Sequence, residues 1–220
     1  MSSFVLKLLA LLSMTIDHVG MVFFPFDSLF RVVGRMAFPL YAFLCAQGCV
    51  HTKNSNRYLL RLGAFALLSE IPYDLAGEGV LFSLQGQNVF FTLFLGVLAV
   101  KLYRQSGRIR DVLLCVLASE LLASDYGWYG VMLVFVFYYF ADQRESMLLA
   151  FAVLTMAFLG YIELATGSGF AALQVWCLSA AVPIWFYNGK RGPSGGKLLF
   201  YGYYPLHLLA IFLISHFNLL

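Results

Sequence analysis

Two arginines and an adjacent acid–imidazole pair stand inside apolar segments near the start of this sequence. Asp17 and His18 lie in the first apolar run, and Arg31 and Arg35 lie in the second, Leu29–Val50. A charged side chain at the centre of a hydrocarbon layer costs about 2.5–3.5 kcal/mol on insertion scales, so such groups face one another or a watery cavity. We therefore interpret these four residues as a candidate reaction site built within a membrane.

The side chains of the four residues indicate what each could do. His18 is a candidate general base, because imidazole exchanges protons near neutral pH, and Asp17 is a candidate partner that fixes its tautomer. Successive residues of a helix point about 100° apart, so Asp17 is also able to pair with an arginine instead. Arg31 and Arg35 share one helix face and could clamp a carboxylate, a phosphate or an oxyanion. The alternative is an ion-pair network that ties two helices together.

The composition excludes an ordinary soluble domain. Of the 220 residues, 61% are hydrophobic and 11% are charged, and the mean hydropathy is +0.83. Soluble domains average about 45–50% apolar and about 25% charged residues. All four cysteines lie in apolar runs without metal-ligand spacing, which favours buried thiols over a metal site. We predict an all-α, polytopic membrane bundle that forms one domain over residues 1–220 and holds no metal.

The apolar runs predict about nine transmembrane helices, several of them short for a hydrocarbon core of about 30 Å. They cover Phe4–Phe24, Leu29–Val50, Tyr58–Tyr73, Asn88–Tyr103, Val112–Ala123, Gly127–Ala141, Met147–Tyr161, Phe170–Tyr187 and Leu199–Phe217. A single bent helix across Ser124 and Asp125 is the alternative to the break before Gly127.

The distribution of charge predicts the orientation of this layout. All lysines and arginines other than Arg31 and Arg35 fall on one side of the nine helices. The opposite loops hold acidic residues, namely Asp27, Asp74, Glu78, Asp125 and Glu163. Cytoplasmic loops carry the excess of basic residues, so we predict a cytoplasmic N-terminus and an outside C-terminus.

Further polar residues fall at the outer ends of later helices. Pro72 frees a backbone carbonyl and is expected to turn Glu70 and Ser69 toward a cavity, although a proline that terminates the helix explains the pattern too. Asn88 is either a substrate contact or a helix N-cap. Asp125 lies in a polar, aromatic turn near the depth of the candidate site.

The last apolar run carries a second histidine. Tyr203 and His207 share one face of the predicted helix beside Pro205. We include Tyr204 and His207 among the candidate substrate contacts. The alternative for His207 is a histidine whose hydrogen bonds are satisfied in the core.

Short motifs along nearly the whole chain resemble the TraX family, proteins named for F-pilin acetylation in conjugation. They are Lys7–Leu11 with Met14 and Ile16-Asp17-His18, Arg31 with Gly34–Leu40, Tyr58–Leu62 with Ser69–Pro72, Asn88 with Phe91–Leu93, Asp125–Gly127 with Gly130, and Tyr204-Pro205 with His207. Tyr73 stands where we expect Phe in the family, and the pattern is loose at Cys45-Ala46-Gln47. The family resembles a compact member of a larger group of transmembrane acyltransferases.

The resemblance implies transfer of an acetyl group from cytosolic acetyl-CoA to an amine or hydroxyl acceptor at or across a bacterial inner membrane. By this carry-over His18 is the catalytic base, with Asp17, Arg31 and Arg35 around it. One arginine would stabilise the tetrahedral oxyanion, a role in which a single donor contributes about 2.7–4 kcal/mol. Direct transfer and a two-step route through acetyl-histidine both stay open.

The expected partners are acetyl-CoA, membrane lipid and an acceptor that is a small molecule, a glycan or a pilin-like peptide, without nucleic acid. A homodimer is a further option. The donor phosphates are assigned to three cytoplasmic arginines, Arg57, Arg61 and Arg104. Basic clusters of this kind also bind anionic lipid headgroups, which is the alternative reading of them.

Two other classes of protein fit the same residues. A proton-coupled transporter also needs acid, imidazole and guanidinium groups that face a cavity, although 220 residues in nine short spans show no inverted repeat. In a non-catalytic assembly protein the charges would be ties between helices.

Overall fold

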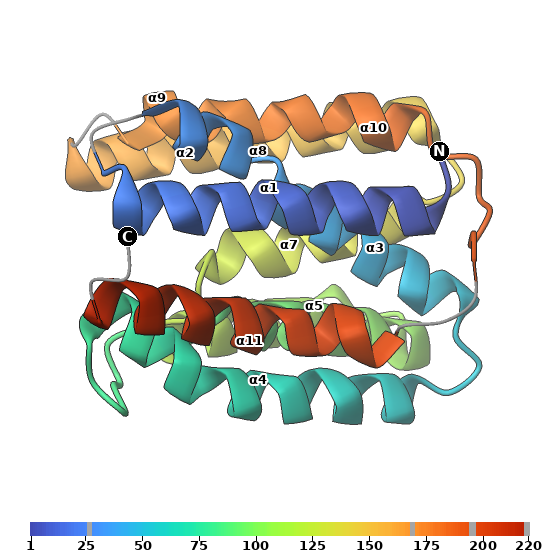
Figure 1. The fold of residues 1–220 in the computed structure, drawn as a ribbon. Coiled ribbons are helices and arrows are strands. Elements are labelled where there is room, and N and C mark those ends of the chain that lie inside the picture. The colour runs from blue at the N-terminus through green and yellow to red at the C-terminus, as the bar shows by residue number, and fades with distance from the viewer. Residues whose placement is uncertain (26–27, 168–169, 194–196, 218–220) are drawn as a thin grey trace.

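The computed structural model describes residues 1–25, 28–167, 170–193 and 197–217, and these residues form a bundle of helices (Figure 1). The helices are α1 Ser3–Phe23, α2 Ser28–Gly34, α3 Ala37–His51, α4 Ser55–Glu78, α5 Val89–Ser106, α6 Ile109–Leu121, α7 Gly127–Tyr139, α8 Arg144–Thr166, α9 Phe170–Gln174, the 3₁₀ helix η1 Val175–Ala180, α10 Ala181–Trp185 and α11 Lys197–His216. The all-α prediction is confirmed for this described part of the chain. Asp27 of the sequence analysis lies outside it.

The helices run roughly side by side between two ends of the bundle (Figure 1). Within the described residues the chain makes nine passes, if α2 with α3, and α9 with η1 and α10, are each counted as one. In the part of the chain that the structure describes, five segments are long and apolar enough to cross a membrane, namely Ser3–Phe23, Ser28–His51, Val89–Ser106, Arg144–Thr166 and Leu199–His216. The chain is thus a helical membrane protein, although fewer helices than the nine predicted meet that criterion in full.

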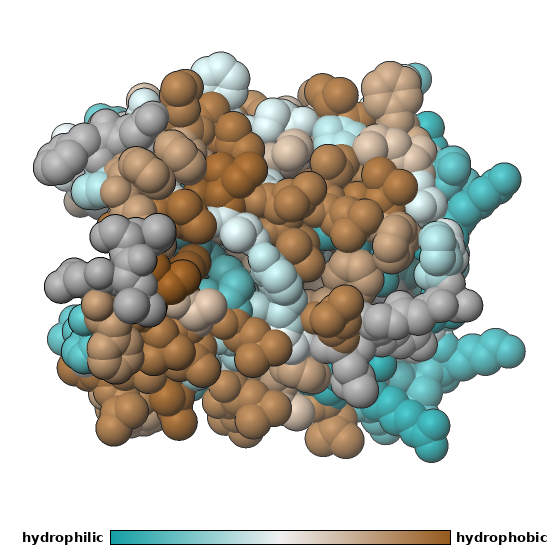
Figure 2. Space-filling view, in the orientation of Figure 1, coloured by the Kyte–Doolittle hydropathy of each residue, from teal (hydrophilic) through white to brown (hydrophobic). Residues whose placement is uncertain are grey.

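The outer surface supports a membrane environment. Figure 2 shows apolar side chains over most of one face and hydrophilic side chains gathered at one end, where the N-terminus lies in Figure 1. Large apolar side chains are widely exposed, for example Leu60 (74%) and Leu67 (70%) on α4 and Leu149 (68%) on α8. A soluble monomer rarely exposes apolar surface on this scale, whereas lipid would cover it.

The second pass is interrupted, whereas the sequence predicts one continuous helix there. α2 ends at Gly34 and α3 begins at Ala37. Pro39 has no amide hydrogen to continue the helical ladder, but it is tolerated in the first turn of a new helix. Ser13 of α1 donates a hydrogen bond to the carbonyl oxygen of Val33 (2.7 Å), which satisfies part of the free end of α2.

Two other boundaries decide where polar residues of the site lie. α4 continues through Pro72 to Glu78 and is capped by Gly79 in a left-handed conformation (φ 72°), so the alternative of a helix that ends at the proline is wrong. The break before Gly127 is confirmed. Ala123 bonds through its carbonyl oxygen to the amide of Gln87 (3.0 Å), and this contact holds the turn between α6 and α7 beside the start of α5.

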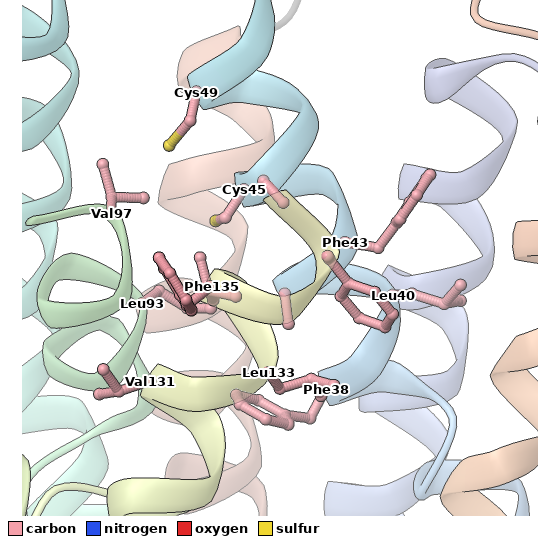
Figure 3. Packing of buried hydrophobic residues seen from close by; sticks show 14 of the residues in the cluster. Phe38, Leu40, Phe43, Cys45, Cys49, Leu93, Val97, Val131, Leu133 and Phe135 are labelled. Atoms are coloured by element: carbon pink, nitrogen blue, oxygen red, sulfur yellow. The ribbon is translucent and has the colours of Figure 1, made fainter. Parts of the chain in front are cut away.

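The apolar core lies where α3, α5 and α7 pack together (Figure 3). Phe43 of α3 meets Phe137 of α7 edge to face, with ring centroids 5.7 Å apart, and both are at most 1% exposed. Gly96 of α5 permits the close approach, because a Cβ there would overlap the side chain of Val134. The four cysteines are buried free thiols, as predicted.

Candidate functional site

A cavity of about 450 Å³ brings together all four predicted catalytic residues and two of the predicted substrate contacts. Six candidate site residues line it: Asp17, His18, Arg31, Arg35, Asp125 and Tyr204. They come from α1, α2, the turn after α2, the turn before α7, and α11. The fold therefore brings together residues that are as far apart as 187 positions in the chain.

Asp17 is the counter-charge of both arginines. Its carboxylate forms an ion pair with Arg31, whose Nη1 lies 3.2 Å from Oδ1, and a second, closer pair between Oδ2 and Nη2 of Arg35. The side chains of Asp17 and Arg35 are 12% and 6% exposed, so this is a buried pair. Within the described residues Asp17 bonds to these arginines and not to His18, so the geometry favours the arginine pairing over the tautomer-fixing role.

The two arginines differ in how many of their donors are occupied. Arg35 donates from Nε to the carbonyl oxygen of Arg31 (3.3 Å), from Nη1 to Gln174 Oε1 (3.2 Å), and from Nη2 to Asp17. Among the described residues Arg31 bonds to Asp17 through Nη1 alone, and its side chain is 23% exposed. Arg35 is thus fixed in place, whereas Arg31 keeps donors for a molecule in the cavity.

Gly34 allows α2 to approach Asp17. A Cβ at Gly34 would overlap the carboxyl group of Asp17, so a side chain at this position must displace the ion pair. Since a core that must absorb an extra carbon loses about 1–3 kcal/mol, we expect Gly34→Ala to lower the thermal unfolding temperature of the protein in detergent.

Gly77→Ala is the matched control for this prediction. Gly77 lies inside α4, lines the same cavity and would place its Cβ in open space. Alanine is the better helix former, so this variant should be at least as stable as the wild type. Equal stability of the two variants would contradict the close approach at Gly34.

His18 pairs with His207 instead of Asp17. His18 Nδ1 lies 2.7 Å from His207 Nε2, and the two rings stack with centroids 5.0 Å apart. His207 Nδ1 lies 2.9 Å from the carbonyl oxygen of Tyr203. A hydrogen bond between Thr15 and the hydroxyl of Tyr203 (2.9 Å) also joins α1 to α11, and Figure 2 shows pale and teal side chains between these two helices. The second histidine is therefore part of the site, through its contact with the first.

Of the six predicted substrate contacts, four do not line the cavity, namely Ser69, Glu70, Asn88 and His207. Asn88 accepts a hydrogen bond from the amide of Phe90 (3.0 Å), which confirms it as the N-cap of α5. Its amide group donates to Glu70 and to the carbonyl oxygen of Ala66 (2.8 Å), so it ties α5 to α4. Because α4 continues past Pro72, the next residues of its inner face, Tyr73 and Asp74, take the place expected for Ser69 and Glu70.

Other residues of the cavity were missed in the sequence. Gln174 of α9 is 1% exposed, and its Nε2 has no hydrogen-bond partner among the described residues. Tyr126 has a positive φ (64°), and its ring stacks on Phe38 with centroids 3.8 Å apart. A lone buried glutamine in an apolar run was the available signal for the first, and the polar turn around Asp125 was the signal for the second.

Asp125 lies in that turn, outside the membrane-spanning segments. Burial raises the pKa of its carboxyl group to about 6, and the guanidinium of Arg35 opposes part of this rise. Its carbonyl oxygen accepts a hydrogen bond from Thr92 of α5, and its amide donates to the carbonyl oxygen of Gln87 (2.8 Å). The backbone of Asp125 is therefore fixed, while its side chain faces the cavity.

A second cavity, of about 530 Å³, opens toward the end of the bundle that carries the N-terminus. Its basic lining consists of Lys7, His51, Lys53, Arg61 and Arg191. Arg57 and Arg104 do not line it, and Arg104 instead donates to the carbonyl oxygen of Cys49 (2.9 Å). Of the three arginines assigned to donor phosphates, the fold places Arg61 alone at this cavity.

The two cavities adjoin. Met14, Tyr41, Val89 and Tyr204 line both of them. Along α1, Ser3 and Lys7 face the basic cavity, and Asp17 and His18 face the other. Two molecules that enter from opposite ends of the bundle would meet close to His18.

Comparison with known proteins matches the chain to one family model and to two relatives. The family model described as TraX protein matches residues 2–215. A relative from Dichelobacter nodosus, "Probable fimbrial assembly protein FimC, serogroup H1", is 30% identical over an alignment of 229 positions that covers 96% of this chain and 94% of the relative. An uncharacterized protein of Rickettsia prowazekii is 26% identical over 101 positions, which cover 46% of this chain and 37% of that protein. No solved structure matches the chain.

Proposed function

The chain belongs to the TraX family, and we propose that it is a membrane-embedded acetyltransferase. It transfers an acetyl group from cytosolic acetyl-CoA to an amine or hydroxyl acceptor at or across a bacterial cell membrane. The observation that carries this proposal is the pair of adjoining cavities, one with a basic lining and one with His18 and Arg31 in its wall. A donor and an acceptor that cannot share one aqueous compartment need such an arrangement.

The basic cavity suits the phosphate groups of the donor. Arginine binds phosphate through paired, charge-assisted hydrogen bonds. The guanidinium of Arg61 lies over the rings of Tyr58 and Tyr201, 5.4 Å and 5.0 Å from their centroids, and its buried Nε has no hydrogen-bond partner among the described residues. We infer that Arg61 contacts a phosphate, and that the thioester end of the donor lies toward the shared wall.

Arg61→Gln should therefore weaken donor binding. A hydrogen bond to a charged group contributes about 1.5–3 kcal/mol, so the KM for acetyl-CoA should rise about ten- to hundredfold, with a smaller change in kcat. The measurement is the initial rate of CoA release at varied acetyl-CoA, together with CoA binding by calorimetry.

Arg57→Gln is the control, because Arg57 is exposed on the same helix one turn earlier and does not line the cavity. Its KM should stay close to the wild-type value. If both variants lose the same affinity, the basic residues of this end act as a diffuse charge and not as a phosphate site.

His18 and Arg31, which line the other cavity, are the residues that act on the reacting groups. The acceptor nitrogen or oxygen attacks the thioester carbonyl carbon while His18 takes its proton. The carbon–sulfur bond then breaks, and the CoA thiolate takes the proton from His18 and leaves as the thiol. Arg31 has donors to spare and is the better candidate for the oxyanion, whereas Arg35 is held by its three protein partners.

A pilin-like peptide is one acceptor that the relatives suggest. The relative from Dichelobacter nodosus is named a fimbrial assembly protein. Pilin acetylation is what the resemblance to the TraX family implies. We call the cavity that His18 and Arg31 line the acceptor cavity. The carboxylates of Glu78 and Asp125 in its wall would attract an ammonium group. We propose the outer side of the cell membrane as the place where this acceptor arrives.

The test is acetyl transfer by the purified protein in liposomes. Radiolabelled acetyl-CoA is supplied with amine and hydroxyl acceptors, including a pilin peptide, and both CoA release and label transfer are followed. Acceptor-dependent CoA release supports the enzyme, and acid-labile label on the protein alone points to an acetyl-histidine intermediate. No donor binding and no turnover by a folded protein would overturn the proposal, after which solute flux in the same liposomes separates a carrier from an assembly protein.

A further inference from the structure

We propose that His207 is a positioning residue that holds His18 in the tautomer with its proton on Nδ1 and its lone pair on Nε2. The tautomer is a property of the folded chain, and its catalytic meaning rests on the proposed function above. The observation behind it is a chain of hydrogen bonds that runs from the backbone of α11 to the ring of His18.

The donors and acceptors along this series of hydrogen bonds are fixed by its last group, the carbonyl oxygen of Tyr203. The carbonyl oxygen of Tyr203 accepts hydrogen bonds and cannot donate, so the proton between it and His207, 2.9 Å away, belongs to His207 Nδ1. A neutral His207 then offers a lone pair at Nε2. The 2.7 Å contact with His18 therefore requires the proton of His18 to stand on Nδ1.

The other proton arrangements are disfavoured. If His18 accepted from a neutral His207, the lone pair of His207 Nδ1 would face the carbonyl oxygen of Tyr203 at 2.9 Å. A doubly protonated His207 would place a cation on a side chain that is 7% exposed and stacked between the rings of Tyr203 and His18, with centroids 5.2 Å and 5.0 Å away. Burying an unpaired charge of this kind is costly.

The tautomer leaves the reactive nitrogen of His18 free. Among the described residues His18 Nε2 has no hydrogen-bond partner, and His18 lines the acceptor cavity whereas His207 does not. His207 thus acts through His18, as the buried aspartate of a serine-protease triad acts through its histidine. Asp17 is not available for that task, because both arginines bond to it.

Nitrogen NMR of the protein in detergent tests the tautomer directly. With ¹⁵N-labelled histidine, the chemical shifts and ring couplings of each nitrogen tell a protonated nitrogen from a bare one. His51→Gln and His216→Gln leave the two histidines of the pair as the remaining signals. We expect a proton on Nδ1 of both rings, which is the less common form of a free histidine side chain. A proton on Nε2 of His18 in the wild type would overturn the proposal.

Two substitutions at His207 separate positioning from packing. His207→Gln can place an amide oxygen where Nε2 stood and should keep the tautomer of His18. His207→Leu removes the acceptor and should shift His18 toward the Nε2-protonated form, with kcat lower by about tenfold or more and the KM for acetyl-CoA little changed. Equal losses of kcat in both variants would indicate a merely structural role and would overturn the proposal.

These outcomes are distinguishable from a failure of the proposed function. If the wild type transfers no acetyl group, the function fails, yet the NMR spectrum still tests the tautomer. If the wild type is active and His207→Leu keeps its full kcat and the wild-type tautomer, the function stands and the positioning role of His207 is wrong.

Discussion

Replacing His18 with glutamine is expected to abolish acetyl transfer and to leave the fold and donor binding intact. Loss of a general base lowers a rate by about 10²–10⁴-fold. His18 is half-buried, and its protein hydrogen bond is the one to His207, which glutamine can in part replace. The basic cavity lies on the far side of the shared wall, so the affinity for CoA should not change.

The measurement compares CoA release and thermal unfolding of His18→Gln with those of His216→Gln. His216 is exposed near the end of α11 and stacks on Phe212, away from both cavities, so its loss should have little effect on either quantity. If His18→Gln releases CoA at the wild-type rate with an acceptor present, then another group is the base. Asp125, whose raised pKa and place in the cavity suit proton transfer, would be the next candidate.

Hydropathy was sufficient to predict the passes of the chain but not the break within one of them. The window over Leu29–Val50 is apolar throughout, and the effect of Pro39 depends on whether a helix continues through it or starts just before it. In α4 the proline has the opposite outcome, because the sequence allows a helix end at Pro72 as an alternative and the helix continues through it. A proline removes one backbone hydrogen bond from a helix. Whether the helix then breaks or continues depends on how the surrounding residues pack.

The sequence predicts which residues belong to the site better than it predicts which of them bond to one another. Charged and imidazole side chains are conspicuous in an apolar run because they are expensive there, so Asp17, His18 and the two arginines stood out from composition alone. Which of them touch depends on how α1 is rotated against its neighbours. His18 turns toward His207, 189 positions away, and its sequence neighbour Asp17 turns toward α2. No local pattern encodes that choice.

Asp17→Asn is expected to cause the largest loss of stability among single substitutions in the site. The change removes the one carboxylate shared by two guanidiniums and leaves Arg35, which is 5% exposed, without the carboxylate to which it is bonded. Breaking a buried pair by removing one partner costs about 3–5 kcal/mol. The measurement is the thermal unfolding temperature in detergent, with Asp111→Asn as a control. Asp111 pairs with an exposed arginine, Arg110, and its loss should change the unfolding temperature little.

A second substitution decides whether the loss comes from the unpaired charge. Adding Arg35→Met to Asp17→Asn removes the buried cation and should restore part of the lost stability, because a buried pair replaced on both sides is often close to neutral. Acetyl transfer should not return with it, since Arg31 would still lack the carboxylate that holds it against the cavity. The double substitution would then recover stability but not activity. Of the two arginines that bond to Asp17, Arg35 would stabilise the fold and Arg31 would act in the reaction. If Asp17→Asn is as mild as Asp111→Asn, the network does not hold α1 to α2.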